Sequence, residues 1–182
     1  MKYKTCVAIT ENNPKRLATK LKKGLKKSDF AEIRFDFFKP KDIPDALELV
    51  KNQLQRCVCT LRPKTEGGKF SGSENERKSI LKLVAEYNPF LLDIEFETLR
   101  KDKKFVKSIK NSKTKILVSW HDFKKTPNLI SLKKTLREMK KFSDYIKIVT
   151  MAKTVNDATK ILSLYNNISK TCLLYTSDAA DE

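Results

Sequence analysis

Residues 31–37 read AEIRFDF, and this stretch decides between the two folds that the rest of the sequence allows. Side chains alternate between the two faces of a β-strand, so Glu32, Arg34 and Asp36 share one face and apolar side chains share the other. When helices cover both faces of a sheet, its strands read instead as nearly continuous apolar runs. The stretch therefore predicts a strand with one apolar face and one charged face.

Short β-rich runs alternate with amphipathic stretches along the chain. The expected strands are residues 4–10, 31–37, 56–62, 90–96, 115–121 and 145–150. The expected helices are residues 14–27, 42–54, 74–87, 98–110, 128–141 and 154–167. Several starts carry signals, with prolines at 14, 40 and 127 and an S-x-x-E capping box from Ser73 to Glu76. Six βα units in strict alternation predict a parallel sheet, either doubly wound or closed as a (β/α)8 barrel.

The polar face recurs on the later strands. Its members beyond residues 31–37 are Thr60, Arg62, Asp93, Glu95, Ser119, His121 and Lys147. A doubly wound sheet would bury these groups in its core, whereas a barrel gathers inward polar side chains at its C-terminal mouth, where barrel active sites lie. We therefore expect one α/β domain with the fold of a (β/α)8 TIM barrel.

The chain is strongly basic, with 39 Lys and Arg against 22 Asp and Glu and a net charge of +17 over 182 residues. Its densest basic cluster, KLKKGLKK at 20–27, alternates leucine with lysine as a solvated helix face does, and it lacks aromatic side chains for base stacking. A solvated face is favoured, and a basic nucleic-acid-binding domain remains the alternative from another class. Apolar runs fall far short of the roughly 20 residues of a membrane span, and no signal core is present, so we expect a cytoplasmic protein.

Lys147 and His121 suggest a chemistry. Lys147 stands between isoleucines in a strand, and because desolvation disfavours the charged form, it is expected to offer a neutral amine that can attack a carbonyl. His121, the sole histidine, is the natural partner for proton transfer. The structural alternatives are a lysine whose head reaches solvent or a carboxylate, and an imidazole that only donates hydrogen bonds. The pair predicts an imine that acidifies a neighbouring C–H bond.

Further charged groups would surround such an imine. Arg34 and Arg62 suit an anionic, polyhydroxylated substrate, and Glu32 can accept hydrogen bonds from hydroxyls. Additional carboxylates are Asp36, Glu66, Asp93 and Glu95. The spacing Cys57-x-Cys59 is not that of a zinc knuckle, so no metal site is expected.

Five motifs, in order, resemble those of one family. They are AEIRFD at 31–36, TLRPKTEGG at 60–68, LLDIE at 91–95, SWHDFKKTP at 119–127 and YIKIVTMA at 145–152. This series resembles the type I 3-dehydroquinate dehydratases of the shikimate pathway, and the likeness runs through about residue 170. It implies a TIM barrel of the class I aldolase-like type. A class I Schiff-base aldolase on the same barrel is the second enzymatic alternative.

The resemblance implies roles for individual residues. Lys147 would form the Schiff base, and His121 would remove a C2 proton and then assist loss of the C1 hydroxyl as an acid. Glu32, Arg34 and Arg62 would bind substrate, with Glu66 supporting His121; Asp93 and Glu95 complete the expected supporting set. The implied reaction turns 3-dehydroquinate into 3-dehydroshikimate and water without cofactor or metal. The expected partner is this small molecule, and a homodimer of a full-length chain is left open.

Residues 172–182, CLLYTSDAADE, do not read as the seventh strand of the expected barrel. They resemble the in-frame translation of a transposon-type sequencing-library adapter. We therefore expect residues 1–171 to form an incomplete barrel of about six of eight βα units, followed by a non-native tail. Without strands 7 and 8, the family's carboxylate-binding arginine and closing-loop serine and glutamine cannot be assigned. The chain as printed is expected to be poorly soluble and inactive.

Overall fold

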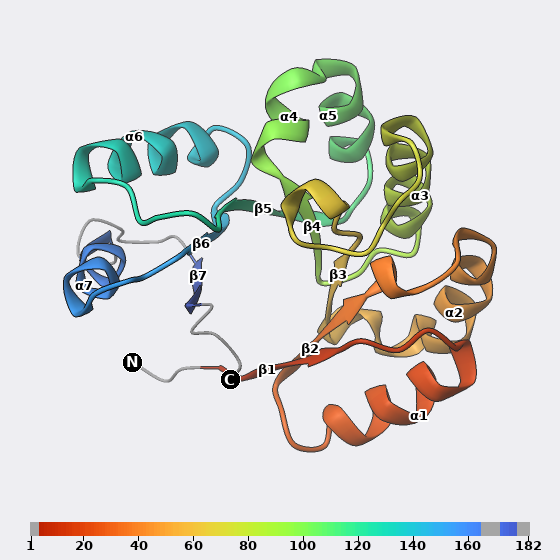
Figure 1. Cartoon of the computed structure of the whole chain (residues 1–182). Coiled ribbons are helices and arrows are strands. Elements are labelled where there is room, and N and C mark those ends of the chain that lie inside the picture. Colours follow the sequence, from red (N-terminus) through yellow and green to blue (C-terminus); the bar gives the residue numbers. More distant parts are fainter. Residues whose placement is uncertain (1–3, 165–171, 178–182) are drawn as a thin grey trace. The chain divides into compact units, whose positions relative to one another are not determined.

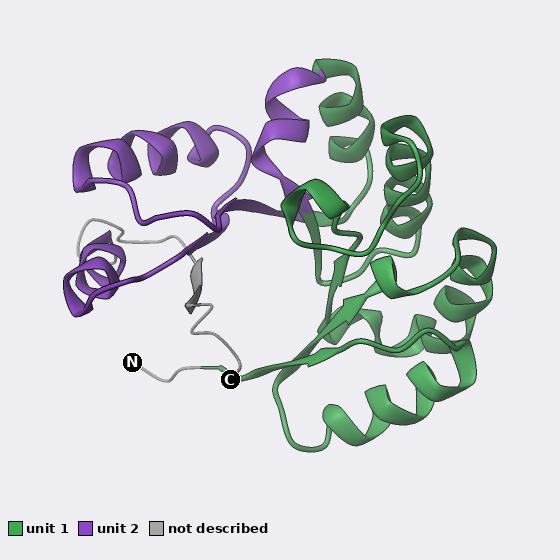
Figure 2. Cartoon of the chain, viewed as in Figure 1, with its two compact units in different colours: residues 1–93, 103–115 green, residues 94–102, 116–182 purple. Residues whose placement is uncertain are grey.

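The computed structural model describes residues 4–164 and 172–177. The chain divides into two compact units, one of residues 1–93 and 103–115 and the other of residues 94–102 and 116–182 (Figure 2). Within the described residues, every helix falls short of the length and apolar character needed to cross a membrane. Both units are built from strands followed by helices, as the sequence pattern predicts (Figure 1).

The first unit contains a parallel sheet in the order β1-β2-β3-β4. Its strands are β1 (Cys6–Ile9), β2 (Phe30–Arg34), β3 (Cys57–Thr60) and β4 (Leu91–Glu95), the last two residues of β4 belonging to the second unit. Ile33 pairs with Cys59, which pairs with Leu92, and all three side chains are fully buried. This row belongs to the apolar face that period 2 predicts for the strands.

Helices of the first unit cover that apolar face (Figure 1). They are α1 (Pro14–Gly24), α2 (Ile43–Val50), α3 (Glu74–Glu86) and α5 (Lys103–Lys110). Leu17 and Leu21 on α1 and Leu81 on α3 are fully buried, which places the core between helices and strands. The side chains of Asn13 and Ser73 cap α1 and α3 by accepting hydrogen bonds from backbone amides three residues on. Ser73 is the capping residue predicted from the sequence.

The second unit repeats the design with the parallel order β5-β6-β7. Its elements are α4 (Phe96–Lys101), β5 (Lys115–Asp122, within the unit from Ile116), α6 (Leu129–Lys140), β6 (Tyr145–Thr150), α7 (Val155–Leu162) and β7 (Cys172–Ser177). Thr154 and Asp157 form a reciprocal capping box at the start of α7, which the sequence reading overlooked. Leu132, Met139 and Ile148 are fully buried and supply its apolar core.

Each of the six predicted strands is present, with ends that differ from the prediction by at most three residues. The helix expected over residues 98–110 is instead two helices, α4 and α5, separated at Asp102, a residue type that favours turns over helix interiors. The helix expected over 42–54 leaves the α conformation at Val50 and continues as a 3-10 helix, Lys51–Arg56. The predicted end of the helix over 154–167 lies outside the described residues.

The predicted strand 31–37 is wrong in its second half. β2 ends at Arg34, and Phe35–Phe37 forms a 3-10 turn, so Asp36 does not lie on the strand face with Glu32 and Arg34. The turn brings the Asp36 carboxylate back onto the Arg34 side chain. Similarly, β3 ends at Thr60, so Arg62 lies in the connection that follows the strand.

The expectation that residues 172–182 form no strand is wrong for residues 172–177. These residues form β7, which pairs in parallel with β6 from Tyr145↔Cys172 to Thr150↔Ser177. An open sheet edge presents unpaired backbone groups, and a run of leucine, tyrosine and threonine has the propensity to pair with them. Because an edge accepts any suitable segment, this pairing leaves the adapter origin of residues 172–182 as a prediction.

Candidate active site

Polar side chains of the first unit gather on neighbouring strands. Arg34 pairs with Thr60, which pairs with Asp93, so the three lie in one row across β2, β3 and β4. Glu32 lies one step back on the same face of β2, and the Thr60 hydroxyl donates a 2.6 Å hydrogen bond to its carboxylate. Thr60, which is buried, therefore orients Glu32, a contact that the strand pattern alone did not predict.

Arg62 and Asp93 form a buried ion pair. The Arg62 Nη2 atom donates to Asp93 Oδ2 at 2.6 Å, and the two side chains are 4% and 0% exposed. Two charges that have been removed from water depend on each other, because either one alone would remain desolvated and uncompensated. The sequence predicted both residues for the site but not that they pair.

Asp93→Ala is expected to lower the free energy of unfolding by about 3–5 kcal/mol, since it leaves the Arg62 charge buried without its partner. Urea titration followed by circular dichroism measures this change. The matched control is Glu48→Ala, which breaks the exposed i,i+3 pair with Lys51 and should shift the midpoint far less. Equal shifts for the two variants would contradict the assignment of a strong mutual dependence to the buried pair.

Arg34 is held by Asp36 and influenced by the neighbouring charges. Its Nε and Nη2 atoms each donate to Asp36 at 2.8 Å. Burial alone would lower the pKa of Arg34, but the hydrogen bonds and charge of Asp36, together with Glu32, outweigh it and raise the pKa, while Arg62 opposes this effect. Arg34 therefore stays cationic, and the unit brings together Glu32, Arg34, Arg62 and Asp93.

The predicted residue Glu66 lies on the connection that leaves β3. It closes a short 3-10 helix, Lys64–Glu66, and is followed by Gly67, whose φ of 75° is in the left-handed region that favours glycine. A Cβ on Gly68 would lie 2.0 Å from the Arg62 carbonyl oxygen, so the chain can fold back here only with glycine. The two glycines of the E-G-G motif thus fix where Glu66 stands relative to Arg62. Support of His121 by Glu66 stays a prediction.

Lys147 and His121 lie on adjacent strands of the second unit. Lys147 is in the middle of β6, opposite Ser119 on β5, while His121 is opposite Val149. Because paired residues of parallel strands point to the same side, both predicted catalytic side chains occupy one face. Lys147 is 8% exposed, as expected for a lysine within a buried strand.

The loop after β5 is tied to the end of β6. The Met151 amide donates to the Asp122 carbonyl at 2.9 Å, and the Thr126 hydroxyl contacts both the Thr150 hydroxyl and the Met151 carbonyl at 2.9 Å. The His121 ring stacks on Phe123, with centroids 5.6 Å apart and planes 14° apart. These contacts hold the segment that follows His121 against the strand that carries Lys147. Sequence reasoning gave Thr126 and Phe123 no role, although both stand in the S-x-H-D-F-x-x-T-P motif.

Glu95, also predicted, is the last residue of β4 and is 1% exposed.

The two cysteines of the Cys57-x-Cys59 spacing are buried. Burial raises the pKa of the Cys57 thiol to about 12 and that of Cys59 well above its ordinary value, so both remain protonated at neutral pH. Among the described residues, no group of three or more His, Cys, Asp or Glu is arranged to hold a metal.

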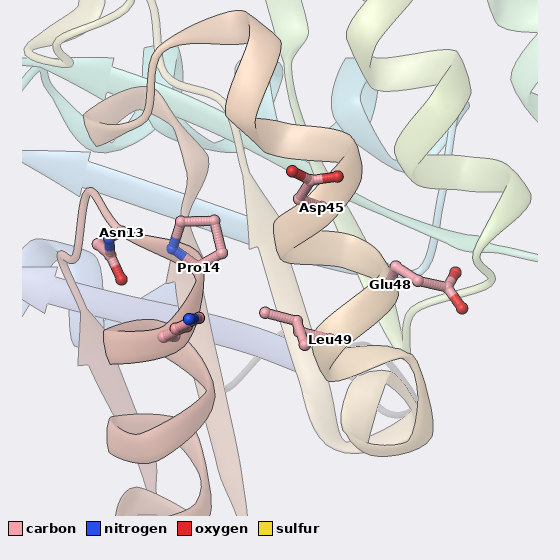
Figure 3. A pocket seen from close by; sticks show the side chains of 6 residues that line it. Asn13, Pro14, Asp45, Glu48 and Leu49 are labelled. Carbon is pink, nitrogen blue, oxygen red and sulfur yellow. The ribbon is translucent and has the colours of Figure 1, made fainter.

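One surface hollow of about 490 Å³ lies elsewhere in the first unit, beside the start of α1 and along α2 (Figure 3). Its lining residues are Asn13, Pro14, Lys15, Asp45, Glu48 and Leu49. None of the predicted site residues lines it. The hollow is therefore separate from the predicted catalytic and substrate-binding residues.

A parallel βα fold whose strands and following connections carry a buried lysine, a histidine and arginines paired with carboxylates is typical of an α/β enzyme acting on a small polar molecule. Comparison with known proteins gives the family. The family model described as type I 3-dehydroquinase matches residues 5–174, and the chain belongs to that family.

Two archaeal relatives carry the same activity in their names. A 3-dehydroquinate dehydratase of Methanococcus maripaludis (strain C7) is 34% identical over 163 residues, covering 88% of this chain and 73% of the relative. That of Methanocaldococcus jannaschii is 32% identical over 163 residues, covering 88% of this chain and 72% of the relative.

Solved structures agree in fold. The 3-dehydroquinate dehydratase of Geobacillus kaustophilus HTA426 superposes with a TM-score of 0.86 at 18% identity, covering 97% of this chain and 74% of that one. The enzyme of Enterococcus faecalis gives a TM-score of 0.84 at 23% identity, covering 96% and 78%. The predicted fold class, an α/β fold of the TIM-barrel type present here in part, is confirmed.

Proposed function

We propose that this chain is the catalytic domain of a type I 3-dehydroquinate dehydratase, a hydro-lyase of the shikimate pathway that turns 3-dehydroquinate into 3-dehydroshikimate and water. The family match over residues 5–174 carries the proposal. The position of Lys147 and His121 on one face of adjacent strands supports it, because imine formation and proton removal must occur on the same substrate.

In the proposed mechanism, the Lys147 amine attacks the C3 carbonyl carbon of the substrate, and water leaves to give an imine. The imine withdraws electrons from C2, so His121 can take a C2 proton as general base. The C1 hydroxyl then departs with a proton from His121, which leaves the conjugated product as an imine. Water releases the product and restores the lysine.

The first unit supplies the proposed binding groups. Arg34 stays cationic, and the guanidinium groups of Arg34 and Arg62 can donate to substrate oxygens, while Glu32, oriented by Thr60, can accept from a hydroxyl. Asp93 holds Arg62 in place through the buried ion pair. Glu66 and Glu95 are proposed to support the site. The proposal includes a cytoplasmic location and no nucleic-acid partner, and a homodimer of the full-length protein remains an open expectation.

The test uses a completed chain, in which residues 1–171 are joined to the part of the Methanococcus maripaludis (strain C7) relative that continues beyond the match. With 3-dehydroquinate, the expected result is rising ultraviolet absorbance from the conjugated enone product. A class I aldolase would cleave a carbon–carbon bond and give no such enone. Substrate consumption without enone formation would therefore contradict the proposal in favour of the aldolase alternative.

A further inference from the structure

Asp36 is a fully buried carboxylate to which the mechanism above gives no role. Its residue exposure is 3%, and its side chain is 0% exposed. Three donors reach it: Arg34 Nε on Oδ1, and Arg34 Nη2 together with the Lys69 backbone amide on Oδ2, at 2.8, 2.8 and 3.0 Å. A buried carboxylate is tolerated where its oxygens are satisfied in this way.

The two bonds to Arg34 fix the orientation of its guanidinium group. A guanidinium carries five N–H donors in a planar fork, and a bidentate contact uses one edge of that fork. The Arg34 cation also lies 5.5 Å from the centre of the Phe37 ring. Because Asp36 binds one edge of the Arg34 guanidinium and the Phe37 ring lies beside it, the remaining N–H donors of Arg34 have a fixed direction. The Arg34 side chain is 23% exposed, so part of it remains accessible.

The bond to the Lys69 amide connects Asp36 to the loop that follows β3. In this loop the Phe70 amide donates to the Arg62 carbonyl at 3.2 Å, and the Lys64 amide donates to the Phe70 carbonyl at 3.1 Å. Lys69 is therefore next to the point at which the loop returns to Arg62. Holding Lys69 holds the closed loop, including Glu66, against the end of β2.

We propose that Asp36 is a positioning residue that fixes the Arg34 fork and the 62–70 loop in one arrangement before substrate binds. This inference rests on the proposed function, in which Arg34 and Arg62 bind substrate. The Asp36 carboxylate serves two segments that are separated by 33 residues in sequence. Its loss should therefore weaken substrate binding through Arg34 and release the loop at Lys69.

The kinetic test compares Asp36→Asn with its parent in the completed chain. Losing the charged contact is expected to raise KM about 10-fold or more, with a smaller effect on kcat. In an Arg34→Ala background the same change should alter KM by a smaller factor, because only the bond to the 62–70 loop at Lys69 then remains for it to remove. The double variant also removes both charges, so it avoids an unpaired buried carboxylate. Asp45→Asn, an exposed change of the same kind, is the matched control.

Amide hydrogen exchange tests the loop tether in the printed chain without any activity. In Asp36→Ala, exchange at Lys69 should rise about 10-fold or more relative to the Leu81 amide of α3. An unchanged ratio would overturn the tether, and equal KM effects with and without Arg34 would overturn the positioning role. If the parent completed chain also lacked turnover, the proposed function would fail, while the exchange ratio would still decide the tether.

Discussion

Replacing Lys147 with alanine in the completed chain is expected to lower turnover of 3-dehydroquinate on the order of 10⁴-fold or more. The lysine is buried in β6, on the same face as His121 of β5, and only its amine can form the proposed imine. Without the imine, only the substrate ketone, a weaker electron sink than the protonated imine, withdraws electrons from the C–H bond that His121 attacks. Initial rates from the enone absorbance measure the loss.

Borohydride provides the direct measurement of the imine. When it is added with substrate, it should reduce the imine and leave a stable adduct, located on Lys147 by mass spectrometry of the peptides. The matched control is Lys153→Ala, an exposed lysine in the connection after β6, which should keep both turnover and adduct. An adduct that persists in Lys147→Ala, or an active parent that gives none, would sink the imine mechanism.

Residue spacing on the strands made much of the site predictable. Period 2 alone places Glu32 and Arg34 on one face of β2 and leaves Ile33 for the core. The same argument places Lys147 within a buried strand and on the side of His121. These positions depend on local backbone geometry, which a short stretch of sequence determines.

Contacts between segments distant in sequence were not predictable in that way. The ion pair of Arg62 with Asp93 spans 31 residues, and the bond from the Lys69 amide to Asp36 spans 33. Each depends on the registers of neighbouring strands and on where a strand ends. At 31–37 the alternation of apolar and charged residues continues past Arg34, but the strand ends there. Residues 35–37 form a turn instead, and in this turn the Asp36 carboxylate reaches its donors. Local patterning therefore misplaced a residue that joins two segments of the site.

The end of the chain shows a different limit of sequence reasoning. Residues 172–177 pair with β6 although their sequence resembles an adapter translation, because strand pairing at an edge uses backbone groups that every segment possesses. Pairing and function are separate properties. A strand in the seventh position can satisfy the edge of β6 without bringing the side chains that a dehydratase needs there.

Replacing residues 172–182 by the continuation of the Methanococcus maripaludis (strain C7) relative is therefore expected to give an active enzyme, whereas the printed chain is expected to show no detectable turnover. The match to the printed chain covers 73% of the length of that relative. Among the described strands β1 pairs only with β2, so its other edge is open. A barrel confines its substrate by closing the sheet, and an open edge also favours association between chains. The continuation should raise both the yield of folded protein and the rate of enone formation.

The same fusion carrying Lys147→Ala is the matched control, because it restores the sheet without the proposed chemistry. It should match the active fusion in yield and thermal midpoint and give no enone. Turnover by the printed chain would contradict the prediction outright. Reading the gene from freshly amplified genomic DNA tests the cause separately, since codons for residues 172–182 followed by a stop would make this segment native. If the segment is native, an active chain would have to bind its substrate with groups from β7 itself. An inactive chain would then owe its inactivity to its native sequence and not to a foreign tail.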